Sequence, residues 1–125
     1  MTAAAMLMAA SNAPLVASVS PAAYGEYACT GYPPSVCVSP QVIATDPAVV
    51  TYTGGDGSSP TYSWAWVSGD TFTVASPSSA STTFSRSTGR LTQYSGIYRC
   101  TLTVGSEVAL LDVPVSTFYN YETGL

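Results

Sequence analysis

The sequence contains no histidine and no lysine, and its only basic residues are Arg86, Arg90 and Arg99. Without histidine the chain cannot build a Ser-His-Asp triad, a Cys-His pair, a histidine-ligated metal site or a histidine pH switch. Three cations displace few counterions from a phosphate backbone, so we expect no nucleic-acid partner. The residue types therefore predict a protein that is not an enzyme and that carries no cofactor and no metal.

Charge of either sign is scarce. Charged residues make up 8% of the chain, with seven acids against three arginines and a net charge of -4. A surface with so few charges gives poor colloidal solubility to a chain that is alone. Protein interfaces are depleted in lysine and enriched in tyrosine, and this sequence has nine tyrosines. The composition favours a chain that stays bound in a larger assembly, as a homo-oligomer or in a lattice.

The start of the chain is apolar but short. Met1–Ala10 falls well below the roughly 20 residues that a membrane-spanning helix needs, so we expect no membrane partner. No basic residue precedes this stretch, as one would in a secretory signal, so we expect an uncleaved N-terminal arm over residues 1–19. Flexible methionine side chains fit irregular grooves on a neighbouring subunit. The predicted contacts of this arm are Met6, Leu7, Met8, Leu15 and Val16.

The cysteines are Cys29, Cys37 and Cys100. Cys29 and Cys37 bracket a turn-rich segment that could bring them close enough for a local disulfide. The alternative is three reduced thiols that pack as small hydrophobic groups. A metal site built from all three is not expected, because the spacing contains no C-x-x-C pair.

Strand signals dominate the rest of the chain. Valine, threonine, tyrosine and tryptophan alternate with small polar residues, and turn residues recur regularly, which is typical of a β-sandwich or barrel. The clearest strand covers residues 96–104, where one face is apolar and the other polar. Other strands are predicted at residues 49–52, 62–67, 72–74, 82–84 and 108–115. Pro114 has no N–H, so the last strand should lie at a sheet edge or change its partner there.

The two ends of the domain are less clear from the sequence. Ser18–Pro21 and Cys37–Pro40 each fit the first strand, and the sequence does not choose between them. We place a domain at residues 20–118, with its core in 49–115. Residues 119–125 form a predicted tail, in which Tyr119 and Tyr121 are further candidate subunit contacts.

Tyr94–Cys100 places a tyrosine two residues before a cysteine, which resembles the F-strand signature of immunoglobulin domains. Trp64 or Trp66 lies at the spacing of the strand-C tryptophan of that family. The resemblance covers residues 49–115. It implies an immunoglobulin-like antiparallel β-sandwich, with a tyrosine hydroxyl that ties down the corner between strands E and F. The implied core signature is Trp64, Trp66, Tyr98 and Cys100.

Two departures from the immunoglobulin pattern affect the expected core. Tyr94 stands where the family has an acid, so its usual Asp–Arg corner pair is absent. Val50 occupies the region of the strand-B cysteine. We therefore expect no inter-sheet disulfide, and we expect Cys100 to be a buried thiol.

A narrower resemblance rests on the Gly54-Gly55 turn, the Tyr62–Trp66 strand, the stretch Ser76–Phe84 and the run Arg99–Thr101. Together these segments resemble the immunoglobulin-like modules of structural proteins of tailed bacteriophages. The resemblance implies a virion component made in the host cytoplasm, either a minor tail protein or a head decoration protein. Its partners would be other virion proteins, bound by buried apolar area and strand pairing.

Two alternatives remain. A carbohydrate-binding or adhesion module on the virion or cell surface would stack a host glycan on Tyr62, Trp66 or the Tyr119/Tyr121 tail. A secreted bacterial immunoglobulin-like protein would require cleavage near Ala13.

Overall fold

The computed structural model describes residues 13–31 and 36–122, and within these ranges the chain is all-β with no α-helix. Among these residues no helix is long and apolar enough to cross a membrane. The strands are β1 (Val16–Val19), β2 (Ala23–Thr30), β3 (Gln41–Ala44), β4 (Ala48–Thr53), β5 (Thr61–Gly69), β6 (Thr73–Val74), β7 (Ser81–Thr82), β8 (Phe84–Thr88), β9 (Gln93–Val104) and β10 (Glu107–Glu122).

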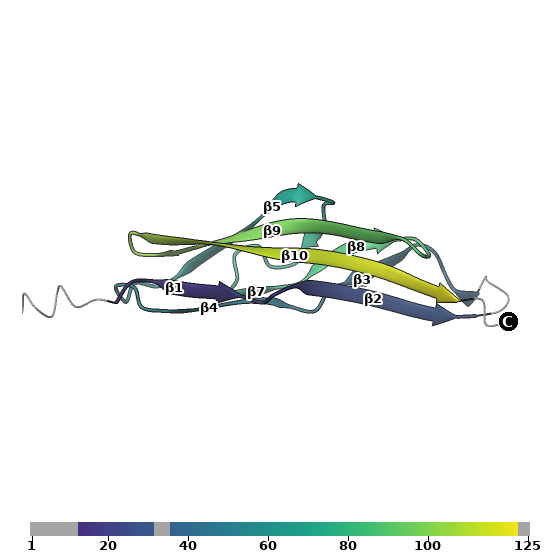
Figure 1. The fold of residues 1–125 in the computed structure, drawn as a ribbon, viewed down its shortest axis with the longest axis horizontal. Coiled ribbons are helices and arrows are strands. Elements are labelled where there is room, and N and C mark those ends of the chain that lie inside the picture. Colours follow the sequence, from purple (N-terminus) through teal and green to yellow (C-terminus); the bar gives the residue numbers. More distant parts are fainter. Residues whose placement is uncertain (1–12, 32–35, 123–125) are drawn as a thin grey trace, which may run out of the picture.

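The strands form two layers in an elongated molecule (Figure 1). One layer is the four-stranded sheet β2-β10-β9-β5, and the other holds the three-stranded sheets β1-β4-β7 and β3-β8-β6. Aromatic rings meet between the layers, since Phe84 of β8 contacts both Trp64 of β5 and Tyr98 of β9. The core also takes in valine and alanine side chains from β2, β4, β9 and β10. This arrangement confirms the all-β prediction.

β10 changes its neighbours along its length, as Pro114 predicts. It pairs antiparallel with β9 from Glu107 to Phe118, without a register shift. Its pairing with β2 is parallel and begins only at Val115, opposite Ala23. Between Glu107 and Pro114, β9 is therefore the only strand of the described chain that pairs with β10.

The N-terminal arm predicted for residues 1–19 is too long, because its last residues form a strand of the sandwich. Val16–Val19 forms β1, which pairs antiparallel with β4 from Val16 opposite Thr53 to Val19 opposite Val50. The reason is alternation, because Leu15, Ala17 and Val19 pack against the core while the residues between them face outward. The first strand is thus the earlier of the two candidates, and residues 37–40 form no strand. Residues 1–12 lie outside the described part of the chain.

The predicted tail also begins within a strand, because β10 continues to Glu122. The side chains of Val113, Val115, Thr117 and Tyr119 alternate inward and are all buried. The alternation of the last predicted strand therefore simply continues past residue 118, and β2 covers the edge of this second half.

Candidate interaction surface

Three of the four predicted core residues lie together between the layers. Trp64, Tyr98 and Cys100 are 5%, 3% and 0% exposed, and Trp64 lies directly opposite Cys100 in the β5–β9 pair. The Trp64 indole N–H donates a hydrogen bond to the Ser79 carbonyl at 2.8 Å. Its ring meets the ring of Phe84 edge to face at 5.8 Å between centroids. The tryptophan thus joins three segments of the chain that are distant in sequence.

Trp66 does not belong to this core, since it is 52% exposed. β5 is the edge strand of its sheet and its register shifts between Trp66 and Ser68. Figure 1 shows the end of β5 at the outer margin of the molecule. The Trp66 indole N–H donates to the Gly69 carbonyl at 3.1 Å, which holds the ring against its own strand.

The Tyr98 hydroxyl ties down a different segment from the one that the resemblance implies. It donates to the Phe72 carbonyl at 2.9 Å and accepts from the Phe72 N–H at 2.7 Å. Phe72 lies in the connection between β5 and β6, whereas the corner before β9 is formed by residues 89–92. The expectation for the E–F corner is therefore wrong, and the hydroxyl fixes the β5–β6 connection instead.

We expect Tyr98→Phe to lower the free energy of unfolding by about 1–3 kcal/mol, because it leaves two part-buried backbone groups of Phe72 without a partner. Urea unfolding followed by circular dichroism measures this change. Tyr62→Phe is the matched control, since no hydrogen bond joins the Tyr62 hydroxyl to the described residues, and its effect should stay below about 0.5 kcal/mol. Equal effects of the two substitutions would contradict this role of Tyr98.

Cys100 is a free, fully buried thiol. Burial raises the pKa of this thiol, which lowers its thiolate fraction as well as its access to reagents. We expect no reaction with a thiol reagent at pH 8 in the folded chain and one reactive thiol per chain in 6 M guanidinium. Fast labelling of the native chain would contradict this placement of Cys100.

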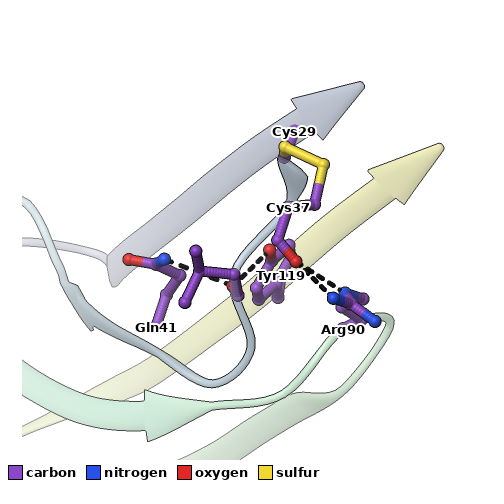
Figure 2. Close-up of a disulfide and its surroundings, with 6 residues drawn as sticks. Cys29, Cys37, Gln41, Arg90 and Tyr119 are labelled. Atoms are coloured by element: carbon purple, nitrogen blue, oxygen red, sulfur yellow. Dashed lines mark hydrogen bonds between the residues drawn. A yellow bond between two sulfur atoms is a disulfide. The ribbon is translucent and has the colours of Figure 1, made fainter. Parts of the chain in front are cut away.

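A disulfide joins Cys29 and Cys37, which are separated by 8 positions in the sequence. It links the end of β2 to the loop before β3. Figure 2 shows two side chains that hold this loop, Arg90 from the turn between β8 and β9 and Tyr119 from β10. The Arg90 guanidinium donates to the Cys37 carbonyl from Nε at 2.9 Å and also from an Nη atom, and the Tyr119 hydroxyl donates to the Val38 carbonyl at 2.6 Å.

Tyr119 and Tyr121, two of the predicted subunit contacts, are occupied within the molecule. Tyr119 is 0% exposed, and its ring meets Tyr27 edge to face at 5.0 Å. The Arg90 guanidinium lies 5.1 Å from the centre of the Tyr121 ring. Tyr119 is therefore a core residue and not a contact, because alternation along β10 turns it inward, and Tyr121 is held beneath Arg90.

The predicted contacts at the other end of the molecule are divided between two environments. Leu15 packs against the core, and its N–H donates to a Glu107 carboxylate oxygen at 2.8 Å. Leu15 is thus used within its own chain, whereas Val16 points outward and is 61% exposed. Met6, Leu7 and Met8 lie outside the described residues.

Exposed apolar side chains lie on the first half of β10, which pairs with β9 but not with β2. Val108 and Leu110 are each 59% exposed, and sequence reasoning missed them. The signal was available, because Val108 and Leu110 alternate with residues that face the core. We call the outward side chains of Val108 and Leu110 the exposed strip of β10. β1 lies beside this half of the strand, where the Leu15 N–H donates to the Glu107 carboxylate.

An ion pair lies next to the exposed strip of β10. Arg99 and Asp112 lie opposite each other on β9 and β10 and form an ion pair at 2.7 Å. The Arg99 guanidinium holds the pKa of Asp112 below its usual range, and the carboxylate in turn raises the pKa of Arg99. Such an exposed pair contributes little to stability, but it compensates the charge of Asp112, whereas the Glu107 carboxylate nearby accepts only from the Leu15 N–H.

An open groove of about 270 Å³ crosses the four-stranded sheet from the end of β5, over β9 and β10, to Ala22 before β2. Its lining includes Ala22, Ser68, Ile97, Pro114 and Ser116 and contains no ionisable side chain. In the described part of the chain no group of three or more His, Cys, Asp or Glu side chains could hold a metal ion. The groove can accept an apolar side chain, but its lining offers no acid or base for a reaction.

Comparison with protein-family models, with curated proteins and with solved structures finds no match for this chain.

Proposed function

We propose that the protein is a non-enzymatic structural component of a tailed-phage virion, either a minor tail protein or a head decoration protein. Its sandwich binds neighbouring virion subunits, and residues 1–12, with Met6, Leu7 and Met8, add contacts from the N-terminal side. It is made in the cytoplasm of the bacterial host. Binding rests on buried apolar area and strand pairing.

The observation that carries this proposal is that three of the four segments of the phage resemblance, all but the Gly54-Gly55 turn, meet at one residue. Trp64, from the tyrosine–tryptophan strand, pairs with Cys100 of the Arg99–Thr101 run. Its backbone N–H donates to the Pro77 carbonyl at 2.9 Å and its indole N–H to the Ser79 carbonyl at 2.8 Å. Separate sequence similarities that converge on one core contact are expected of a shared fold.

The strand order supports an immunoglobulin-like sandwich in particular. The first strand of such domains divides between the two layers, and here β1 pairs with β4 in one layer while β2 pairs with β10 in the other. The remaining strands place β9 between β10 and β5, as strand F lies between G and C. Val50 is 4% exposed in β4, so it fills the place of the strand-B cysteine as a core residue.

The experiment is to purify, on a density gradient, the phage particles released by cells that carry the gene. We expect the chain to sediment with the particles at a fixed stoichiometry. A chain found only in the soluble fraction would overturn the proposal.

A second measurement in the same system tests the N-terminal contacts. A chain without residues 2–12 should be incorporated less well, and a chain with Met6, Leu7 and Met8 changed to serine controls for length. The deletion ends before β1, because Leu15, Ala17 and Val19 pack against the core. Unchanged incorporation of both variants would assign the binding to the sandwich alone.

Glycan binding is a second candidate, favoured by the 52% exposure of Trp66. A flat aromatic ring at the margin of a sandwich can stack on a sugar ring. Titration with host polysaccharide should then shift the tryptophan fluorescence of the chain, and Trp66→Phe should abolish the shift while Trp64→Phe should keep it. An unchanged spectrum would remove this candidate.

A further inference from the structure

The Cys29–Cys37 disulfide lies apart from the contacts that close the sandwich. Neither cysteine belongs to the hydrophobic core cluster, which includes Trp64, Phe84 and Tyr98. The bond joins two residues that are 8 positions apart, at the end of β2 and in the loop before β3. The two layers can therefore close over their core before this bond forms.

Both cysteines are also held in place by contacts that do not involve their sulfur atoms. Cys29 is placed by the parallel pairing of β2 with β10. The Cys37 carbonyl accepts from the Arg90 guanidinium, and the Val38 carbonyl accepts from the Tyr119 hydroxyl (Figure 2). The Cα atoms of the two cysteines are 5.8 Å apart, within the range of residues that form a disulfide. A folded chain without the bond should thus keep its two thiols side by side.

The two cysteines differ in their access to reagents. Cys37 is 0% exposed, whereas Cys29 is partly exposed on β2. A dissolved oxidant therefore meets Cys29 first. Cys100 does not compete for it, because that thiol is fully buried in the core.

The bond supports a strand that has few other partners. β2 is an edge strand, and among the described strands it pairs with β10 alone. Edge segments with few partners are the ones that open locally at low free energy. A covalent link from the end of β2 to the loop before β3 opposes this opening.

The compartment in which the chain is made works against the same bond. Glutathione and thioredoxin keep thiols reduced in the cytoplasm, and disulfides persist in oxidising surroundings outside it. A chain made in the cytoplasm therefore folds with both thiols free and meets an oxidant only after it leaves the cell.

We infer that Cys29 and Cys37 form a redox lock, which is open in the cytoplasm and closes by oxidation of the folded chain after its release. The inference rests on the proposed synthesis in the host cytoplasm. The oxidant is a small disulfide such as oxidised glutathione.

The closing reaction has two exchange steps. The Cys29 thiolate attacks one sulfur of oxidised glutathione, which releases one glutathione thiolate and leaves a mixed disulfide on Cys29. The Cys37 thiolate then attacks the Cys29 sulfur and releases the second glutathione thiolate. Two electrons pass from the cysteine pair to the glutathione, and the two thiol protons end on the released glutathione thiolates.

Thiol trapping tests the inference on the full chain. Acid at the moment of lysis stops thiol exchange, because it removes the thiolates. The denatured chain is then alkylated, and mass spectrometry counts the alkylated cysteines. We expect all three cysteines to be alkylated in chain taken from the cytoplasm, and Cys100 alone in chain kept with oxidised glutathione after release. A chain with both Cys29→Ala and Cys37→Ala is the control, with one alkylated cysteine in both samples.

A bond that is already closed in the cytoplasm, or two thiols that stay free after release, would overturn the inference. The count reads the cysteines of the chain itself and does not depend on particles. It can therefore fail while the chain still sediments with phage particles, and it can succeed when the chain does not, so the two proposals are tested separately.

Single-cysteine variants test the order of attack. In the folded chain with oxidised glutathione, Cys37→Ala should form the mixed disulfide on Cys29 at least about tenfold faster than Cys29→Ala forms it on Cys37, because access limits the rate. In 6 M guanidinium the two rates should become similar. Equal rates in the folded variants, or a faster reaction at Cys37, would contradict the assigned order.

The purified, reduced chain tests whether the open lock is folded. Its circular dichroism at low temperature should match that of the oxidised chain. The effective concentration of the two thiols, measured against glutathione, should be at least about tenfold higher in the folded chain than in 6 M guanidinium. An unfolded reduced chain, or equal effective concentrations, would overturn the inference.

Discussion

Trp64→Ala should lower the free energy of unfolding by about 3–5 kcal/mol, whereas Trp66→Ala should change it by less than about 1 kcal/mol. The two tryptophans are alike in type and lie two positions apart on one strand. Trp64 is 5% exposed, contacts Phe84 and donates to the Ser79 carbonyl, so its removal leaves a cavity and an unpaired acceptor. Trp66 is 52% exposed, and its removal leaves a position that water can fill.

Urea unfolding of both variants, followed by circular dichroism in the β-sheet region, measures the difference. If Trp64→Ala leaves too little folded protein to measure, Trp64→Phe keeps part of the ring and should still cost more than Trp66→Phe. Equal losses from the two positions, or a larger loss at Trp66, would show that the layers close over a different part of β5.

Reduction of the Cys29–Cys37 disulfide should lower the free energy of unfolding by about 2–3 kcal/mol, according to the loop-closure estimate for a short loop. For a domain of this size that corresponds to a fall in Tm of roughly 10–15 °C. The contacts of Arg90 and Tyr119 with the Cys37 and Val38 carbonyls remain after reduction, so the loop should stay docked at low temperature.

Thermal unfolding with and without a reductant measures the effect. The variant with both Cys29→Ala and Cys37→Ala is the control, and its Tm should not respond to the reductant. The thiol of Cys100 is present in both chains and is already reduced, so it does not contribute to the difference. A wild-type Tm that does not change on reduction would contradict a stabilising role of this bond.

Alternation of apolar and polar residues was enough to predict the strands that form the centre of the sandwich. In β9 the buried Tyr98, Cys100, Leu102 and Val104 alternate with partly exposed residues, and the sequence shows this directly. The burial of Cys100 could be predicted in the same way, because it depends only on which face of β9 the residue occupies. The change of neighbours next to Pro114 could also be predicted, because it depends only on the missing N–H of that residue.

β2 was missed because its sequence carries few β-branched or large apolar residues. Gly25 explains part of this, since a Cβ at that position would lie 2.3 Å from the Ala44 carbonyl oxygen. The close approach of β2 to the end of β3 requires glycine there, and glycine is a poor strand signal. Such a requirement arises between segments distant in sequence, so it cannot be found in either segment alone.

The candidate contacts were harder to predict than the core. Tyr119 was expected to be a subunit contact and is buried, whereas Trp66 was expected in the core and is exposed. Exposure depends on where the facing layer ends, and the sequence of the strand itself does not show this. The point at which β10 begins to pair with β2 could not be predicted from local pattern, since it depends on where β2 starts, opposite Val115. Pro114 indicated where along β10 the pairing would change, but it did not indicate which of the two neighbouring strands would stop pairing there.

We propose that the chain acts by binding other subunits of a particle through apolar surface and strand pairing. With three arginines and seven acids, attraction between charges can supply little of this binding. The most direct measurement is the amount of the chain that sediments with purified phage particles at 0.1 M and at 1 M NaCl, where the screening length falls from about 10 Å to about 3 Å. We predict the same bound amount at both salt concentrations. A chain that dissociates at 1 M NaCl, or that never sediments with the particles, would contradict the claim.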